Sequence, residues 1–272
     1  MNRVPRPSRD VAGRLDLDRP NAARMYDYYL GGSANVAIDR AAADELIRSL
    51  PDMVFAARAN RSFLGRVVRF LSEQGIDQFL DLGSGIPTVG NVHEIAQSVN
   101  PEARVAYVDI EPVAVSYGHK LLRDEKQVTI TKADIRRPST VLTAPGVTDL
   151  LDFSRPVAVL AVAILHVMSD ADAPLEFLGE YRAACVPGSY LAISHLSPQT
   201  WDPQEITHSQ QVYARTPTPI SYRDRTEILR FMTGYHLVKP GLTLLPNWRP
   251  TDRASTKEAA RSNSYGAVGR LD

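Results

Sequence analysis

Residues 79–90, with the sequence FLDLGSGIPTVG, limit the fold of this chain more than any other stretch. The apolar run QFLDL carries Asp81 near its end and breaks at once into Gly-Ser-Gly at 83–85. A second apolar run, RVAYVD, ends in another acidic residue, Asp109. Two buried parallel strands that deliver glycines and acids to one edge of a sheet make a nucleoside-binding crevice. We therefore predict that the glycines let the backbone approach a ligand and that Asp109 accepts the hydroxyl groups of a ribose.

Two kinds of nucleoside-binding site compete for this segment. A dinucleotide site requires G-x-G-x-x-G, but Thr88 stands where the third glycine belongs. Pro87 also removes a backbone N–H that a pyrophosphate would use. D-x-G-x-G, from Asp81 to Gly85, instead resembles motif I of class I S-adenosylmethionine (SAM) methyltransferases, whose ligand has no phosphate.

Blocks along most of the chain carry a more specific resemblance. In order, they are PNAARMYDYYLGGSANVAIDR (20–40), RANRSFLGR (58–66), FLDLGSGIPTVGNVHEIAQ (79–97), YVDIEPVAVSYGHKLL (107–122), ADIRRP (133–138), LHVMSD (165–170), PGSYLAISH (187–195), RTPTPISYRDRTEILRFMTGYHLVKPGLTLLPNWRP (215–250) and YGAVGR (265–270). Together they resemble a bacterial family called the S-adenosyl methyltransferase family, formerly a domain of unknown function. Ser33-Ala34 and Ile110-Glu111 depart from the Lys-Asp and Asn-Asp that the family usually has there.

The fold that we expect is an α/β, Rossmann-like class I methyltransferase fold. From residue 76 onward, continuous apolar runs alternate with amphipathic helices, a pattern typical of a parallel sheet covered on both faces. We predict a mostly parallel seven-stranded sheet with helices on both faces and an N-terminal helical extension. YHLVKPGLTLL (235–245) and SYGAVGR (264–270) are predicted as its antiparallel closing strands. The predicted division is a mobile tail over 1–17, a helical extension or lid over 18–75, and a SAM-binding domain over 76–272.

Composition excludes several classes of partner. Lys+Arg and Asp+Glu both number 31 in the 272 residues, so the net charge is zero and we expect no nucleic-acid partner. No apolar run approaches the roughly 20 residues of a membrane span, and the N-terminus does not read as a secretory signal. With the single Cys185, which cannot form an internal disulfide, these features predict a cytoplasmic protein. They do not indicate its oligomeric state.

The resemblance implies a set of SAM-binding residues at three strand tips. Asp81 would anchor the loop or the ligand's amino group, although it may equally cap its own turn as an Asx residue does. Ile110 would lie against adenine, Asp134 would meet the adenine amino group unless it is a solvated turn residue, and Ile135 would offer its N–H. The predicted set at these tips is Asp81, Gly83, Ser84, Gly85, Asp109, Ile110, Asp134 and Ile135.

A second group of candidate cofactor contacts comes from the front helices. MYDYYLGGSAN places Tyr26 and Tyr28 ahead of the flexible pair Gly31 and Gly32, beside the crevice in the resembling family. Aromatic rings with a polar tip suit a cover over a partly polar ligand, and the glycines could act as its hinge. The alternative is that the tyrosines pack the helix on the body while the glycines cap it.

Fewer residues in the sequence indicate how the methyl acceptor would bind or react. His166, in ILHVMSD after the fourth strand, is the best candidate for a general base, and its alternative role is a hydrogen-bonded wall residue. His195 and His93 have weaker claims. We predict no metal site, because one cysteine and no H-E-x-x-H spacing leave no ligand set.

Three functions stay open at this point. The first is a methyltransferase that uses SAM as cofactor and acts on a small-molecule acceptor. The second is a SAM-binding sensor or regulator without transferase activity. The third, an NAD(P)-dependent oxidoreductase, is disfavoured by the missing third glycine.

Overall fold

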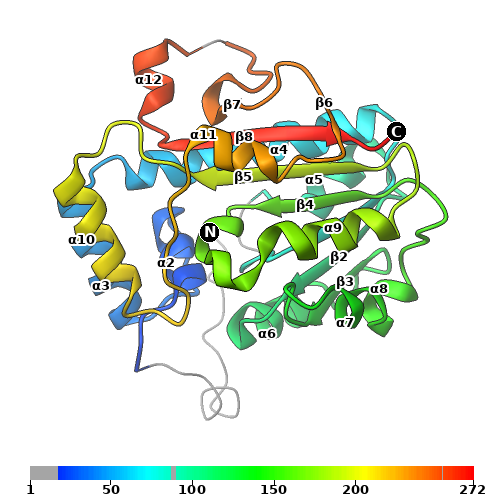
Figure 1. The fold of residues 1–272 in the computed structure, drawn as a ribbon. Helices are drawn as coiled ribbons and strands as arrows, with labels where there is room; N and C mark the ends of the chain where they lie inside the picture. Colours follow the sequence, from blue (N-terminus) through cyan, green and yellow to red (C-terminus); the bar gives the residue numbers. More distant parts are fainter. Residues whose placement is uncertain (1–17, 87–89, 253) are drawn as a thin grey trace.

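One large sheet forms the centre of the computed structural model, which describes residues 18–86, 90–252 and 254–272. Within these residues the sheet has eight strands, in the order β3-β2-β1-β4-β5-β8-β6, with β7 beside β8 (Figure 1). The strands are β1 (Gln78–Leu82), β2 (Arg104–Asp109), β3 (Val128–Lys132), β4 (Ala158–Val162), β5 (Tyr190–Leu196), β6 (His236–Leu237), β7 (Thr243–Leu244) and β8 (Ser264–Arg270). The predicted tail over 1–17 lies outside the described residues.

The α/β fold class is confirmed, and the strand number is corrected. Strands β1 to β5 pair in parallel, and β8 runs antiparallel to β5. The segment YHLVKPGLTLL does not form one closing strand. It forms two strands of two residues each, β6 and β7, which pair separately with β8. The sheet therefore has eight strands where the sequence predicted seven.

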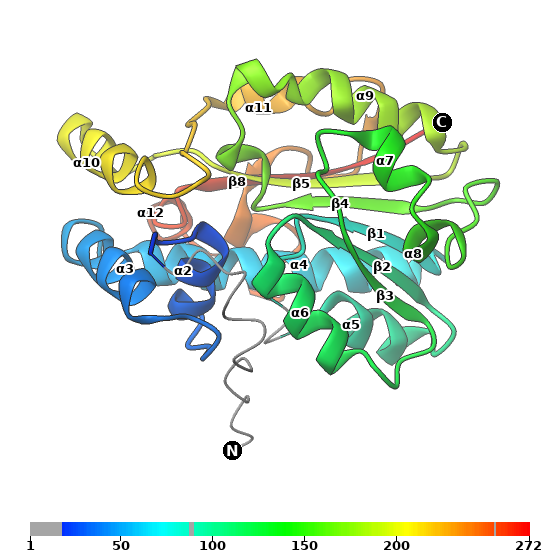
Figure 2. The ribbon, with the colours of Figure 1, turned by 90° about the horizontal axis from the view of Figure 1, so that it is seen from below.

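Helices cover both faces of the sheet, as Figure 2 shows. On one face lie α4 (Met53–Glu73), α5 (Val92–Val99) and α6 (Pro112–Leu121). On the other lie α7 (Pro138–Leu142), α8 (Pro145–Thr148), α9 (Pro174–Ala184) and α11 (Arg225–Arg230). Strands β1, β4 and β5 are buried at every position because both of their faces meet helices.

A third group of helices packs beyond the carboxyl ends of the parallel strands. It consists of α2 (Ala22–Tyr29), α3 (Ala37–Ser49) and α10 (Pro203–Tyr213), grouped beside one end of the sheet in Figure 1. Met25, Leu46 and Val212, one from each helix, share an apolar cluster with Leu196 at the end of β5. The helices that precede and follow the main sheet in the sequence thus meet at the sheet edge where ligands bind in open α/β folds.

The strand order reverses beside β1, whose neighbours are β2 and β4. A crevice forms at such a switch point, outside the carboxyl ends of the strands. On the β4 side the apolar run continues to Leu165, but the strand stops at Val162 because Ala163 adopts a positive φ of 58°. The chain turns there into the short 3-10 helices η1 (Leu165–Val167) and η2 (Asp170–Asp172).

The remaining short elements are the 3-10 helix η3 (Leu245–Asn247) and the helix α12 (Thr256–Ala260), which precedes β8. None of the helices in the described part of the chain has the length and apolar character needed to cross a membrane.

Candidate functional site

The loop after β1 contains Gly83 and Gly85, and the two positions require glycine for different reasons. Both have positive φ angles, 73° at Gly83 and 65° at Gly85, a conformation that side chains disfavour. A Cβ on Gly83 would lie 2.4 Å from a carbon of Ile164, so this glycine permits close packing against the end of β4. A Cβ on Gly85 would meet no atom within 4 Å, because this glycine borders open space.

Asp109, at the tip of β2, is joined directly to that loop. Its carboxylate accepts a hydrogen bond from the Gly85 N–H at 2.7 Å and another from the Glu111 N–H at 2.8 Å. Burial raises the pKa of Asp109, and these backbone N–H groups oppose the rise. The carboxylate is therefore held in one orientation, with acceptor capacity left for the hydroxyls of a ligand.

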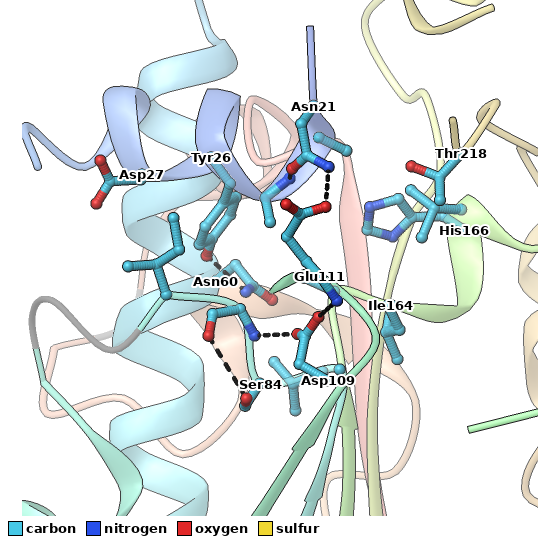
Figure 3. A pocket seen from close by; sticks show the side chains of 18 of the residues that line it. Asn21, Tyr26, Asp27, Asn60, Ser84, Asp109, Glu111, Ile164, His166 and Thr218 are labelled. Atoms are coloured by element: carbon cyan, nitrogen blue, oxygen red, sulfur yellow. Dashed lines mark hydrogen bonds between the residues drawn. The ribbon is translucent and has the colours of Figure 1, made fainter. Parts of the chain in front are cut away.

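A cavity opens over these strand tips (Figure 3). Its volume is about 1050 Å³, a figure that includes the part open to solvent. Its walls are Asn21, Ala22, Ala23, Tyr26, Asp27, Leu30, Asn60, Arg61, Leu64, Asp81, Gly83, Ser84, Gly85, Ile86, Asp109, Ile110, Glu111, Val162, Ala163, Ile164, His166, Val167, Tyr213 and Thr218. They come from the tips of β1, β2 and β4 and from the helices α2, α4 and α10.

Eight of the predicted site residues line this cavity. They are Tyr26, Asp81, Gly83, Ser84, Gly85, Asp109, Ile110 and His166. Ile110 is 51% exposed, which leaves an apolar side chain available to a planar ring at the cavity wall. Tyr28, Gly31, Gly32, Asp134 and Ile135 are not among the lining residues, although the sequence predicted them at the site.

Two of these displaced residues follow β3. The Asp134 carboxylate is held by the guanidinium of Arg136, two residues on, with contacts of 2.8–3.2 Å. Arg136 also bridges to Asp172 at 2.7 Å. Ile135 is buried in the apolar cluster on one face of the sheet, and its carbonyl accepts a hydrogen bond from Tyr181. Local pairing thus occupies the side chain that the resemblance placed near the adenine amino group.

The other three displaced residues stabilise α2. The Tyr28 hydroxyl donates to Asp44 of α3 at 2.9 Å. Gly31 ends the helix with a φ of 81°, as C-terminal glycines do. A Cβ on Gly32 would lie 2.0 Å from an oxygen of Asp27, so only glycine fits beside that carboxylate. These contacts are those expected of residues that end and pack a helix.

Asp81 lies buried in the floor of the cavity with an altered acidity. Its pKa is raised to about 7, chiefly by burial; the Arg61 guanidinium lowers this pKa, and the nearby Asp109 carboxylate raises it. A carboxyl group in such surroundings favours a cationic partner when it ionises.

The N-terminal end of α2 is bound to the loop after β2. The Asn21 amide donates to the Glu111 carboxylate at 2.7 Å, as Figure 3 shows. Arg24, buried and paired with Asp39 of α3 at 2.7 Å, also lies 3.7 Å from Glu111. Through these contacts the loop that carries Asp109 and the helix above the cavity are mechanically connected.

A second chain of hydrogen bonds crosses the cavity wall from α2 to β4. The Asn60 amide donates to the Tyr26 hydroxyl at 2.8 Å, and its oxygen accepts from Ser194 at 2.5 Å. Ser194 in turn accepts from the N–H of Ala163 at 2.8 Å. This chain holds the left-handed turn at Ala163, which a side chain disfavours.

His166 is enclosed and uncharged. Burial and the neighbouring Arg223 guanidinium lower its pKa to about 4. The backbone N–H of Leu196 donates to Nδ1 at 3.4 Å, and an N–H can only donate, so we assign the proton of the neutral ring to Nε2. His166 therefore presents a hydrogen-bond donor at Nε2. Figure 3 shows Thr218 beside it.

The imidazole rings of His195 and His93 form hydrogen bonds with other residues of the protein, outside the cavity. The His195 Nδ1 contacts the Leu196 carbonyl at 2.8 Å, and its Nε2 accepts from Arg223 at 3.0 Å. His93 pairs with the Tyr107 hydroxyl at 2.8 Å. Neither lines the cavity.

Several lining residues were not predicted from the sequence. Asn60 and Arg61 are polar positions in the quoted block 58–66, and that interruption of an apolar stripe was a usable signal. Thr218 carried none, because its position depends on how the segment after α10 folds back over the sheet edge. Asn21 and Glu111 become recognisable only as a pair, 90 residues apart.

The comparisons with known proteins agree with this geometry. A crystal structure of a candidate methyltransferase from Thermobifida fusca YX is 38% identical, covers 98% of both chains and superposes with a TM-score of 0.90. That of a DUF574 family protein from Streptomyces avermitilis MA-4680 is 37% identical, covers 95% of this chain and 100% of that one, and has a TM-score of 0.87. No functionally curated protein matches the sequence. The sequence profile named S-adenosyl methyltransferase matches residues 8–272. The chain therefore belongs to the S-adenosyl methyltransferase family, whose cofactor is SAM.

Proposed function

We propose that this chain transfers the methyl group of SAM to a small-molecule acceptor held in the same cavity. The observation that carries the proposal is the continuity of that cavity. It runs from the glycine loop and Asp109 to a compartment walled by Tyr26, Leu30 and Tyr213. Helices α2 and α10 bring these side chains beside the strand tips, so the donor and the acceptor would bind next to each other in one cavity.

The residues at the strand tips suit SAM. Gly85 leaves empty the space that any Cβ would fill. Asp109 is held by two backbone N–H groups and keeps lone pairs for ribose hydroxyls. Ile110 exposes an apolar side chain for adenine. When bound, SAM supplies a methyl group that its cationic sulfur already activates toward a nucleophile.

The chain's own residues then have to orient the acceptor and exclude water. His166 suits a positioning role. Its Nδ1 accepts a hydrogen bond from the Leu196 N–H, which leaves Nε2–H to donate one to the acceptor. An acceptor with a hydrogen-bonding oxygen or nitrogen would dock against His166 and Thr218. Its apolar body would lie against Leu30, Val167 and Tyr213. We therefore infer a compact, largely apolar acceptor with a polar reactive end.

Two measurements on the full chain test this function. Calorimetry with SAM and S-adenosylhomocysteine (SAH) should give saturable heats. Incubation of SAM with panels of small phenols, carboxylic acids, amines and thiols should give SAH only when a suitable acceptor is present. Folded protein that gives no heat with either ligand at millimolar concentration contradicts cofactor binding. Tight SAH binding without turnover across all four panels would instead favour a SAM sensor.

A further inference from the structure

Arg61 of α4 lines the cavity, yet no residue of the described chain pairs with its guanidinium. Its Nε is buried and has no hydrogen-bond partner there. The other enclosed arginines differ. Arg24 pairs with Asp39, Arg223 binds Asp170 and backbone carbonyls, and Arg66, on the same helix as Arg61, donates to the carbonyls of Trp248 and Leu245.

The aliphatic stem of Arg61 passes near Gly90, and its charged end makes no hydrogen bond with the described residues. Its Cγ and Cδ lie 3.9 and 3.8 Å from the Cβ position of Gly90, and its guanidinium carbon lies 5.9 Å from the ring centre of Tyr26. Such an approach to an aromatic face contributes little at this distance. A partly desolvated cation without hydrogen-bond partners is costly, so a bound anion would stabilise it.

The charges around Arg61 limit what that anion can be. The lining residues include four carboxylic acids, Asp27, Asp81, Asp109 and Glu111, and Arg61 is the one guanidinium among them. SAM carries two cationic groups, the sulfonium and the amino group, and one carboxylate. The acids suit the cations, which leaves the carboxylate of the methionine end for Arg61. Asp81, whose pKa responds to both Arg61 and Asp109, lies close enough to both to link the two ends of the site.

We infer that Arg61 binds the carboxylate of SAM, and that the site thereby prefers SAM and SAH to adenosine thioethers that lack the amino acid. A guanidinium can hold a carboxylate through two parallel hydrogen bonds. The inference rests on the cofactor site of the proposed function and adds a residue to it. It also explains why this arginine has no hydrogen-bond partner among the described residues of a cavity rich in acids.

The test compares two ligands that differ only at the methionine end. SAH has the amino acid, and 5′-methylthioadenosine keeps the adenosine and the sulfur without it. Calorimetry would measure both on the parent, on Arg61→Met, on Arg61→Lys and on Arg66→Met. The last is a matched control, since Arg66 lies on the same helix but binds backbone carbonyls away from the cavity.

We expect Arg61→Met to weaken SAH binding by about ten- to a hundredfold, the effect of losing hydrogen bonds to a charged group. Binding of 5′-methylthioadenosine should stay within about twofold, because that ligand has no carboxylate to lose. Arg61→Lys should keep part of the preference for SAH, since lysine retains the positive charge but cannot form the two parallel hydrogen bonds of a guanidinium. Arg66→Met should keep the whole preference. A thermal melt should show Arg61→Met about as stable as the parent without ligand, because the guanidinium makes no hydrogen bond or salt bridge with the described residues.

Two results would overturn the inference and leave the cofactor site standing. One is SAH binding by Arg61→Met as tight as by the parent. The other is an equal loss of SAH and 5′-methylthioadenosine in a folded variant, which would make Arg61 a packing residue. If the parent itself binds neither ligand, the cofactor site of the proposed function fails and the inference fails with it.

Discussion

The side-chain amide of Asn21 donates a 2.7 Å hydrogen bond to the carboxylate of Glu111. This bond joins the residue that caps α2 to the loop that follows Asp109, two residues after the proposed ribose contact. A helix above a cavity is thereby tied to the floor of the cavity. Local opening of α2 should then depend on what the loop binds.

Glu111→Ala should loosen α2, because it removes the Asn21 hydrogen bond and the nearby charge that faces Arg24. Hydrogen exchange of residues 22–30 should become faster in the variant without ligand. In the parent, SAH should slow exchange across 24–35 if that segment covers the cofactor. Equal exchange there, alongside clear protection near Gly83 and Asp109, would leave α2 as a packing element and reject the lid.

Asp109→Ala should weaken SAM binding by ~1.5–3 kcal/mol, the worth of hydrogen bonds to a charged acceptor. Asp77→Ala is the control, since Asp77 also belongs to the β1 region but pairs with Arg155 on the exposed surface. Calorimetry on the three proteins separates the effects. Unchanged binding by the Asp109 variant would place the ribose elsewhere.

Gly85→Ala should obstruct the cofactor, and Gly75→Ala should not. Both glycines have positive φ angles, 65° and 88°, and a Cβ on either would meet no atom within 4 Å. The backbone strain of ~1–2 kcal/mol is therefore shared, and thermal melts should shift alike. Only Gly85 lines the cavity, so only its variant should lose SAH binding in calorimetry. Similar affinities for the two variants would contradict this assignment.

His166→Gln should keep more activity than His166→Ala, because a glutamine amide can still donate a hydrogen bond. If His166 were a general base, both variants would lose ~10²–10⁴-fold in rate. The pKa of about 4 means that the imidazole is neutral above that pH. The rate of the parent should therefore show no loss from His166 as the pH falls from 8 to 5.5. Steady-state kinetics with an acceptor found in the panels measures both the activity of the variants and the pH dependence of the parent. A Gln variant as inactive as the Ala variant would instead support His166 as the general base.

Asp81 should make SAM affinity depend on pH. Its pKa of about 7 in the folded protein means that the carboxylate ionises as the pH rises from 6 to 8. The cationic amino group of SAM favours the ionised form, so affinity should rise over this range. Asp81→Asn should bind with little change across it. Calorimetry at four pH values measures the SAM affinity of both proteins. An equal dependence of affinity on pH in the parent and in Asp81→Asn would exclude Asp81 as the titrating group.

The same shift predicts how stability changes with pH. The pKa of Asp81 is raised from 3.8, the value expected in the unfolded chain, so the folded state holds this proton more tightly. Its contribution to stability is therefore fully present below pH 3.8 and is lost as the pH rises through about 7. Thermal melts without ligand should show the advantage of Asp81→Asn over the parent growing toward pH 8.

Local patterns in the sequence were sufficient to predict the sheet and its ligand-binding edge. The parallel strands β1 to β5 are short apolar runs, and their tips follow from where each run ends. Asp81, Gly85 and Asp109 could be predicted at the site because each lies within two or three residues of a strand end. The two-residue strands β6 and β7 were merged into one, since so short a pairing leaves no periodic pattern to read.

Side-chain partners far apart in the chain could not be predicted in this way. Asp134 has the position predicted for it after β3, but Arg136 holds its carboxylate, and rotamers rather than strand order decide that pairing. Asn60 meets Ser194 across 134 residues, and Asn21 meets Glu111 across 90.

The sequence by itself determined the α/β fold and the glycine loop, because these depend on hydrophobic periodicity and short-range backbone geometry. Its ordered blocks of residues carried the family resemblance. Only the tertiary structure decided that α2 and α10 lie beside the strand tips and that Arg61 borders the cavity with no hydrogen-bond partner among the residues described. It also showed His166 as a neutral hydrogen-bond donor. Such properties depend on distance, burial and the direction of single N–H groups, which packing fixes only when distant segments come together.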